Sequence, residues 1–368
     1  MILEFYDNSF RLLGVVDKIQ SLTWERFWQR LSTFDLTIPM SEDLLPLVQN
    51  GNFIMRDDID DVYMVTATEI SRDANGLLMA HITGVDSLGI LNQRIIKDQV
   101  NFHGQVDNLI GRLLYTNAIP HSGYELDSYR SFGTLFSYNN AGFNSDAINT
   151  QIRFDPLLDK IYELCQQYGL GIRGRRNAGT IVIDITAQED HSGTIYFSDG
   201  MENLSAWSVA KNIAEYKSIA YIAGEGEGTK RTVVTFGQGK GLDRFETYVD
   251  ARDLSRETDD GIIPMSQYRY VLRQRGEEEL IQYQSTNDFF AEGEDVVYHY
   301  PDDYQLGYIV YVSTLDTDVY ALVSGVTEIF DAEGYSIFPT FEVIQIAGEI
   351  LAQNGNGLIT ENGSTLHT

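Results

Sequence analysis

The stretch from residue 216 to residue 247 constrains the fold most, because it reads as consecutive β-strands joined by glycine-rich turns. β-Branched and aromatic residues fill 216–223 and 231–236, and the sequences GEGEG and GQGKG interrupt them. This pattern predicts antiparallel β-structure in the second half of the chain. Residues 1–84 contain further short runs of this kind, for example 33–38, where apolar and polar residues alternate.

We therefore predict a mainly β fold with an α+β insertion, in which two antiparallel β-barrel-like modules flank an α/β segment. The expected parts are a first module at 1–95, a middle α/β domain at 96–203, a second module at 204–345 with a helical insertion at 256–289, and a flexible C-terminal tail at 346–368. No repeat of fixed period is visible in the letters, so the repetition is one of architecture.

Several segments have the apolar spacing of helices, namely 85–96, 106–118, 156–169 and 263–284. The helix at 156–169 is the clearest, because its apolar residues fall on one stripe, and Asp155 is expected to cap it and Gly169 to end it. A further strand is expected at 296–300. Residues 118–149 are polar and are expected to form a long excursion on the surface.

The formal net charge of −28 limits the classes of partner. Binding to nucleic-acid phosphates needs clustered Lys and Arg, and an anionic membrane surface would repel this chain. The charge serves either solubility alone or a repulsive surface past which nucleic acid slides. No run approaches the ~18 apolar residues of a membrane span, and the N-terminus MILEFYDNSF lacks the pattern of a secretory signal.

Residues for catalysis or metal binding are not recognisable in the sequence. The six histidines share no metal-like spacing, and the single cysteine, Cys165, is expected to be a buried structural thiol. In GQGKG, Gly241 follows Lys240 where a phosphate loop needs Ser or Thr. We therefore predict no catalytic, cofactor-binding or metal-binding residues, no cofactor, and no enzymatic activity.

Two charged segments have structural interpretations that we favour. The sequence DDIDD, with Asp57, Asp58, Asp60 and Asp61, lacks the glycine and glutamate that a calcium loop requires, so we expect a solvated turn. The other segment is the only local basic patch, and we expect it to be a solvated hairpin tip. It consists of Arg173, Arg175 and Arg176.

Several separated segments resemble one family. They are FYDNSFRLLGVVDKIQSLTWERFWQRLSTFDLTIP, ITGVDSLGILNQRII, FDPLLDKIYELCQQYGLGIR, TIYFSDGMENLSAWS followed by YKSIAYIAGEGEGTKR, VLRQRGEEEL and YQLGYIVYV. In this order they are similar to the siphophage tail hub proteins, and they cover most of residues 2–345. Tyr308 departs from the family, whose members often have Asp after the Leu-Gly pair.

This resemblance implies a structural virion protein at the distal end of the tail, in the tail tip or baseplate. Such hubs are related to the N-terminal hub region of tail-associated lysins and to the T-even phage baseplate hub. They form homotrimers whose two β-barrel-like modules per chain make a pseudo-sixfold ring that continues the tail tube. The implied neighbours are the distal tail protein, the tape measure protein, the tail tube protein and tail fibre or receptor-binding proteins.

DNA would cross the lumen of this ring without specific binding during ejection. From the net charge we expect an acidic lumen wall, with the three arginines of the basic patch outside it. Two other functions remain open: a host-carbohydrate-binding tail adhesin, favoured by the Tyr and Asn residues of 123–149, and a cell-wall hydrolase.

Overall fold

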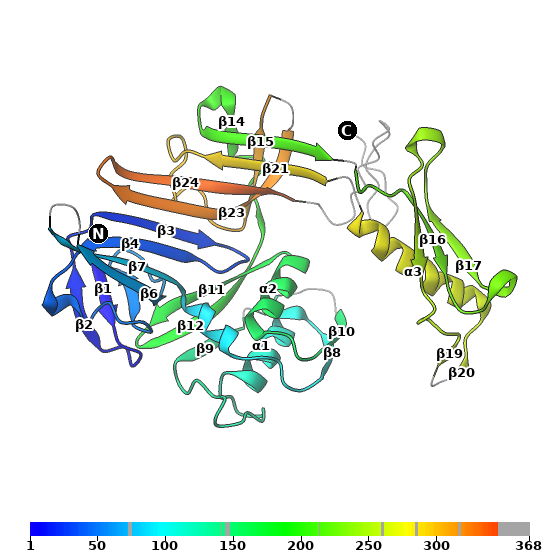
Figure 1. Cartoon of the computed structure of the whole chain (residues 1–368), viewed down its shortest axis with the longest axis horizontal. Helices are drawn as coiled ribbons and strands as arrows, with labels where there is room; N and C mark the ends of the chain where they lie inside the picture. Colours follow the sequence, from blue (N-terminus) through cyan, green and yellow to red (C-terminus); the bar gives the residue numbers. More distant parts are fainter. Residues whose placement is uncertain are drawn as a thin grey trace. The chain divides into compact units, whose positions relative to one another are not determined.

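The computed structural model describes residues 1–72, 76–140, 142–143, 148–212, 214–258, 261–283, 286–315 and 318–344. The chain forms two compact units (Figure 1). The first unit contains Met1–Trp207 and the described residues from Phe290 onward, and the second contains Ser208–Phe289. The expected tail at 346–368 lies outside the described residues. None of the described helices is long and apolar enough to cross a membrane.

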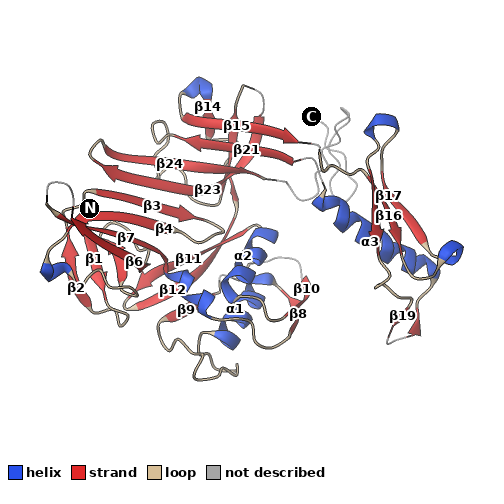
Figure 2. Cartoon of the chain, viewed as in Figure 1, coloured by secondary structure: helices blue, strands red, loops and turns tan. Residues whose placement is uncertain are grey.

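A large sheet dominates the first unit (Figure 2). Its strands are β1 (Leu3–Tyr6), β2 (Leu12–Val16), β3 (Ser21–Phe27), β4 (Thr33–Pro39), β5 (Phe53–Arg56), β6 (Tyr63–Arg72), β7 (Leu78–Asp86), β13 (Glu189–Asp190), β14 (Tyr196–Ser198), β15 (Leu204–Asn212), β21 (Thr286–Gly293), β22 (Tyr308–Ser313), β23 (Asp318–Asp331) and β24 (Gly334–Val343). Along the sheet the order is β15-β21-β24-β23-β3-β4-β7-β6-β5-β1-β2, and β22 pairs with β23, β13 and β14. The expectation of a mainly β protein is confirmed.

Neither half of this sheet forms a closed barrel among the described residues. The sheet path has two ends, at β15 and at β2. The physical reason lies in β23, a strand of 14 residues that is long enough to pair at several places. Its second half pairs antiparallel with β3, from Gly325 opposite Phe27 to Phe330 opposite Leu22. This pairing joins the N-terminal and C-terminal strands into one sheet instead of two closed ones.

The same strand order occurs twice along this sheet. One set of four neighbouring strands has the spatial order β15-β21-β24-β23. Along the chain these strands are the first, second, fourth and third of the set. The strands β3, β4, β7 and β6 follow in the same direction with the same order. We call these sets the C-terminal four and the N-terminal four. The repeat of architecture that we expected is therefore present as a repeat of strand order.

Details of pairing match between the two sets. Strand β6 is bulged between Val65 and Ala67, and β23 is bulged between Val323 and Gly325. At each bulge a hydroxyl donates to a carbonyl oxygen of the neighbouring strand at 3.2 Å: Thr66 Oγ1 to Thr83, and Ser324 Oγ to Thr340. Counting from the bulges, Ala67 corresponds to Gly325.

A glycine before each following strand completes the match. Gly51 and Gly307 both have φ of +90°, a conformation that glycine adopts without strain. Gly51 N donates to the Val65 carbonyl at 2.8 Å, and Gly307 N donates to the corresponding Val323 carbonyl at 3.0 Å. The short strands β5 and β22, which begin after these glycines, therefore also correspond.

The middle of the first unit contains two helices, α1 (Val106–Asn117) and α2 (Leu157–Gln167), and two small sheets. Strands β8 (Val100–Gly104) and β10 (Ile148–Ile152) form one sheet, and β9 (Phe136–Asn139), β11 (Leu170–Asn177) and β12 (Thr180–Ala187) form the other. The helices at 106–118 and 156–169 are thus confirmed. Fully buried side chains of both helices share one core: Leu109, Leu113, Leu158, Ile161 and Cys165.

Local expectations in this region need three corrections. Residues 87–93 form a 3₁₀ helix, η2 (Ser87–Gln93), because β7 extends to Asp86, whose carboxylate accepts the Leu88 N–H at 2.8 Å. Asp155 does not cap α2; Pro156 holds the N-cap position without a side-chain bond, whereas Gly169 ends the helix as expected, with φ of +61°. The polar stretch 118–149 contains β9 and the start of β10.

The strand expected at 296–300 is a turn. The Asp295 carboxylate accepts the Tyr300 N–H at 2.8 Å and the Tyr304 hydroxyl at 2.9 Å. A side chain that satisfies the backbone in this way competes with strand pairing. The short 3₁₀ helix η1 (Glu42–Leu44) follows β4 and has no capping bond from the side chain of Ser41.

The second unit packs helix α3 (Met265–Gln282) on a sheet of β16 (Ile219–Ala223), β17 (Val233–Gly237) and β18 (Glu246–Asp250), and it has a small hairpin of β19 (Glu257–Thr258) and β20 (Gly261–Ile262). Strand β17 is antiparallel to β16 as expected, but β18 is parallel to it, which corrects the purely antiparallel expectation. We expected these strands to share a module with those at 290–343. Among the described residues they pair only with one another.

Helix α3 contacts its sheet along a stripe of residues four apart: Tyr268, Leu272, Gly276 and Leu280. Gly276 permits the closest approach, because a Cβ there would lie 2.4 Å from Ile222 Cδ1. In sequence this unit is inserted between β15 and β21. The corresponding connection in the N-terminal four, between β3 and β4, consists only of residues 28–32.

Candidate functional site

A buried charged cluster lies where β23 meets β3. Glu328 on β23 is only 2% exposed, and its carboxylate accepts from Arg56 Nη1 at 2.6 Å and contacts the Arg26 guanidinium. The Tyr335 hydroxyl also donates to this carboxylate. Arg56 is held in turn by Asp58 through two bonds, of 2.9 and 2.6 Å.

This cluster fixes the joint between the two sets of strands. Arg26 comes from β3 and Arg56 from β5, whereas Glu328 and Tyr335 come from β23 and β24. Burial is the largest single influence on the pKa of Arg56 and pushes it down, but the hydrogen bond to Asp58, the charge of Asp58 and the contribution of Tyr335 together outweigh burial, so the net shift is upward. The guanidinium therefore stays charged, and removing its carboxylate partner would leave buried positive charge without compensation.

The acidic turn and the basic patch meet each other. Asp57, Asp58 and Asp60 are exposed, as a solvated turn requires, but the arginines lie within strand β11 and not at a hairpin tip. Arg173 pairs with Asp60 and lies 3.7 Å from Asp61, and Asp61 lies 3.6 Å from Arg26. The reason is that β11 extends to Asn177 and passes alongside residues 60 and 61. The acidic turn thus extends the buried cluster toward the surface.

The other two arginines of the patch also have acidic partners. Arg175 pairs with Asp184 across the β11–β12 hairpin, and Arg176 Nη1 lies 3.0 Å from the Glu4 carboxylate. The basic patch therefore joins the middle of the chain to its N-terminal strands, and its cations are engaged within the chain.

The histidines do not gather into a site. His81 lies 2.8 Å from Asp35, His299 lies 3.4 Å from Asp295, and His191 stacks on Tyr308 with ring centroids 3.9 Å apart. Within the part of the chain that the structure describes, no group of three His, Cys, Asp or Glu side chains could hold a metal ion. His367 lies outside that part.

Cys165 is fully buried on α2, as expected, and burial raises the pKa of its thiol to about 12. It is therefore protonated and unreactive at neutral pH. The sequence GQGKG forms the turn between β17 and β18, and it is followed by a three-residue 3₁₀ helix (Gly241–Asp243). A phosphate loop would open a long helix there, so this turn does not have that geometry.

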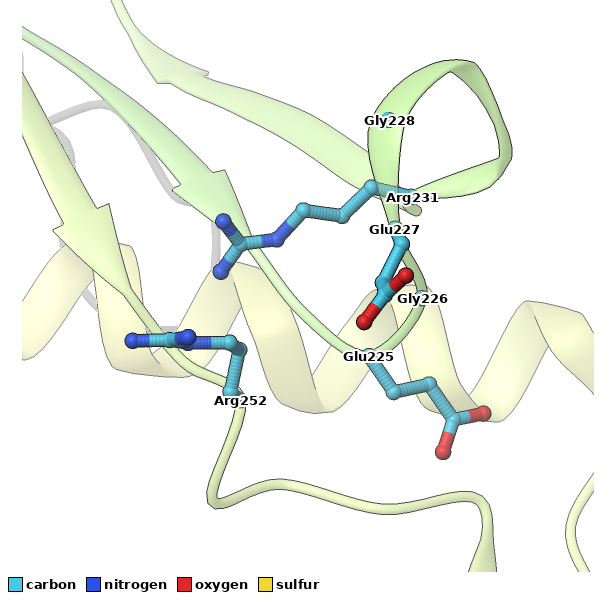
Figure 3. A pocket seen from close by; sticks show the side chains of 6 residues that line it. All are labelled: Glu225, Gly226, Glu227, Gly228, Arg231 and Arg252. Atoms are coloured by element: carbon cyan, nitrogen blue, oxygen red, sulfur yellow. The ribbon is translucent and has the colours of Figure 1, made fainter.

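The second unit has a pocket of roughly 460 Å³ beside the GEGEG turn, which Figure 3 shows. Its lining includes Glu225, Glu227, Arg231 and Arg252. Arg231 donates to the Ala223 carbonyl at 2.8 Å and to Asp250 at 2.7 Å, so its guanidinium is used within the fold. Hydrogen bonds from Arg252, and then from Arg231, lower the pKa of Asp250 to about 2.

The sequence reasoning missed the central residues of the cluster. A signal for Glu328 was present, because it is a lone acid within the apolar run of β23, and buried acids are rarely found without a partner. Its partners could not be read from the sequence, because Arg26 and Arg56 lie about 300 positions away in the chain.

Solved structures of the same fold include two tail proteins and a chain of a PdpA–VgrG complex. The 43 kDa tail protein of prophage MuSo2 from Shewanella oneidensis has a TM-score of 0.55 and 13% identity, with 93% of this chain and 98% of that chain covered. The tail protein from Neisseria meningitidis MC58 has a TM-score of 0.52 and 12% identity, covering 92% and 95%. A chain of the Francisella PdpA–VgrG complex has a TM-score of 0.50 and 10% identity, covering 93% and 57%.

These likenesses show a shared fold, and none of the three proteins is described as an enzyme. No curated protein matches the chain in sequence. The model of one family matches residues 2–341, nearly the whole chain. This match and the fold confirm the resemblance to siphophage tail proteins. The chain belongs to the family of Siphovirus ReqiPepy6 Gp37-like proteins.

Proposed function

We propose that this protein is a structural hub at the distal end of a siphophage tail, where three copies form a ring around a channel for DNA. The observation that carries this proposal is the repeated strand order of the N-terminal and C-terminal fours. Two similar sets of strands per chain are what a threefold ring needs in order to continue a sixfold tube.

The joint between the two sets supports a ring. Inside one chain, β23 of the C-terminal four pairs antiparallel with β3 of the N-terminal four. A contact of this head-to-tail kind can be repeated from chain to chain, and it closes when the rotation per step divides a full turn. With a rotation of about sixty degrees per set, six sets, and so three chains, complete the ring.

The family and the fold support the position in the virion. The family is one of siphoviruses, one of the similar structures is a prophage tail protein, and another is a tail protein. The implied partners are the tail tube and tape measure proteins along the axis, the distal tail protein around the ring, and fibre or receptor-binding proteins outside it. The domain limits at 95, 203 and 345 remain part of this proposal.

The acidic charge supports a channel that DNA crosses without binding. A net charge of −28 per chain makes much of the ring surface negative. A wall with more Asp and Glu than Lys and Arg would repel phosphates and so avoid the counterion-releasing contacts that hold DNA. The ion pairs of Arg173, Arg175 and Arg176 fit this picture, because these cations are neutralised within the chain.

Light scattering on the purified protein tests the proposal. We expect a mass of three times 41.6 kDa at micromolar concentration. A stable dimer would contradict the ring. The same preparation can be offered bacterial surface glycans and peptidoglycan: binding of glycan by a monomer would favour the adhesin, and release of soluble fragments would favour the hydrolase.

A further inference from the structure

We propose that strand β6 of one copy pairs antiparallel with β15 of the next copy, and that this joint covers Ile70 and Leu78. The inference rests on the proposed ring and names the surfaces that close it. It follows from comparing the two sets of strands position by position.

The outer half of β6 has a free edge among the described residues. Strand β5 pairs with β6 only at Tyr63 and Met64, so Ala67–Arg72 pairs with β7 alone. The corresponding residues of β23, Gly325–Phe330, pair with β24 on one side and with β3 on the other. They are buried or half-buried, whereas Ala67–Arg72 is almost entirely exposed. One neighbouring strand is thus missing beside β6.

The strand that fits this position is β15. Strand β15 is the last strand at one end of the sheet order, and β3 would be a last strand too if β23 did not pair with it. Within the C-terminal four, β15 has the place that β3 has within the N-terminal four. Ser205 and Ala206 on it are exposed. An exposed free edge is a template for pairing with another chain. The edge of β15 belongs to the first strand of the C-terminal four, and the edge of β6 belongs to the last strand of the N-terminal four.

The charged cluster offers an independent check, because its positions can be compared between the two joints. Counting from the matched bulges and strand pairs, Glu328 corresponds to Ile70 and Tyr335 to Leu78. By the same count Arg56 corresponds to Val312, and Arg26 to Ser208. The three charged residues at the centre of the joint inside the chain, Glu328, Arg56 and Arg26, are thus each matched by a neutral residue at the joint between copies.

The neutral residues occur on both copies that would form the joint: Ile70 and Leu78 on one copy, and Ser208 on the next. Ile70 is 43% exposed and Leu78 38% exposed in the isolated chain, although both are apolar. If these residues met an arginine at the position of Arg26, its charge would be buried without a partner. They would instead meet a second copy that has Ser208 there. At these corresponding positions the joint inside the chain is therefore ionic, whereas the joint between copies has apolar or neutral side chains.

The repeat also sets the register of the proposed pairing. The Glu294 N–H donates to the Asn203 carbonyl at 2.9 Å, which places Ser205 opposite Glu292. Glu292 corresponds to Asp35, and Asp35 lies opposite Thr23, so Ser205 corresponds to Thr23. Thr23 lies opposite Ile329, which corresponds to Ser71. Ser71 of one copy should therefore lie opposite Ser205 of the next.

Disulfide trapping tests this register. The double variant Ser71→Cys with Ser205→Cys should give covalent dimers and trimers on oxidation, because directly opposed residues of paired strands are close enough for a disulfide. The native Cys165 is buried and does not interfere. The matched control is Ser71→Cys with Ala206→Cys, whose side chains face opposite sides of the sheet and should not be linked.

The outcomes separate this inference from the proposed ring. A trimer by light scattering with linkage only in the Ser71–Ser205 variant supports both. A trimer without that linkage, or with equal linkage in the control, overturns the β6–β15 joint and leaves the ring. A monomer or dimer by light scattering overturns the ring, and the joint with it.

A second variant tests the apolar character of the joint. Ile70→Glu should lower the fraction of trimer at least tenfold at micromolar concentration, because it buries a carboxylate without an arginine partner. Leu242→Glu is the control, since Leu242 is 96% exposed in the 3₁₀ helix Gly241–Asp243 of the second unit, and its trimer fraction should not change. Equal trimer fractions in both folded variants, verified by circular dichroism, would overturn the apolar joint.

Discussion

Glu328 shows how one residue can determine the arrangement of two halves of a chain. It is the one buried acid on β23, whose other two acids stand at the strand's ends, and it holds two arginines of the N-terminal strands. A buried ion pair contributes little net stability compared with a well-packed apolar substitute, but it penalises arrangements in which a partner is missing. We infer that this cluster selects the β23–β3 joint over other pairings of β23.

Replacing Glu328 tests this role. Glu328→Gln keeps the shape of the side chain but leaves Arg26 and Arg56 buried without a carboxylate, so the free energy of unfolding should fall by about 3 kcal/mol. Glu333→Gln is the matched control, because Glu333 is exposed in the turn before β24. Thermal and urea unfolding of both variants measures the difference. Equal stability of the two would show that the cluster does not hold the joint.

Asp86 gives a prediction about pH. Burial raises the pKa of its carboxyl to about 6, against the stabilising N–H bonds from Ser32 and Leu88. Between about pH 4 and pH 6, the Asp86 carboxyl is protonated in the folded state but ionised in the unfolded state. Above pH 6 it is ionised in both states, and burying the ionised carboxylate lowers the free energy of unfolding. This cost disappears as the pH falls from 6 to 4.

The measurement is a comparison with Asp86→Asn, which cannot ionise. Relative to this variant, the natural protein should gain stability as the pH falls from 7 to 4, by at most about 3 kcal/mol. The comparison removes the contribution of the many other acids, which titrate in both proteins. Unfolding curves at pH 4, 5, 6 and 7 that stay parallel for the two proteins would refute the raised pKa.

At the scale of elements, local patterns predicted what local forces determine. The apolar stripe of α2 and the alternation in β4 were sufficient, because each element buries one face against a core. The predictions were wrong where a single side chain or a distant segment determines the local structure. Asp295 converts 296–300 into a turn, and the parallel pairing of β18 depends on which edge of β16 it reaches.

The charged segments and the repeat failed to show in the sequence for a related reason. The partners of Arg173 and Arg176 lie more than 100 residues away in the chain, so both segments looked like solvated turns. The repeat is carried by strand order, bulges and backbone bonds, while corresponding side chains such as Ile70 and Glu328 differ in kind. Because the backbone geometry repeats while the corresponding side chains differ, the repeat cannot be recognised in the amino-acid sequence.

A glycine substitution tests the packing of the N-terminal four. A Cβ on Gly84 of β7 would lie 2.1 Å from the Met64 carbonyl oxygen and 2.4 Å from the Phe34 ring. Because one of these atoms is backbone between paired strands, Gly84→Ala should cost about 2 kcal/mol of stability or more. Gly193→Ala is the control, since nothing lies within 4 Å of its Cβ position, and its melting temperature should be unchanged. Equal melting temperatures would show that β6 and β7 separate freely at this point.

At the scale of the whole molecule, the two joints have different chemistry. The joint inside a chain is ionic and forms once per folded chain, whereas the proposed joint between copies is apolar and depends on concentration. Salt should therefore weaken the trimer little, because apolar contacts are not screened. Trimer fraction measured from 0.1 to 1 M salt should stay constant or rise, and dissociation at high salt would indicate an ionic joint instead.

The account's central claim is that the repeated strands build a threefold ring with six similar parts. Electron microscopy of the purified protein viewed along its symmetry axis tests it most directly. We predict a closed ring with threefold symmetry, a central channel, and a wall of six similar β-sets joined edge to edge. A particle with twofold symmetry, or a threefold particle whose two sets per chain lie at different distances from the axis, would contradict it.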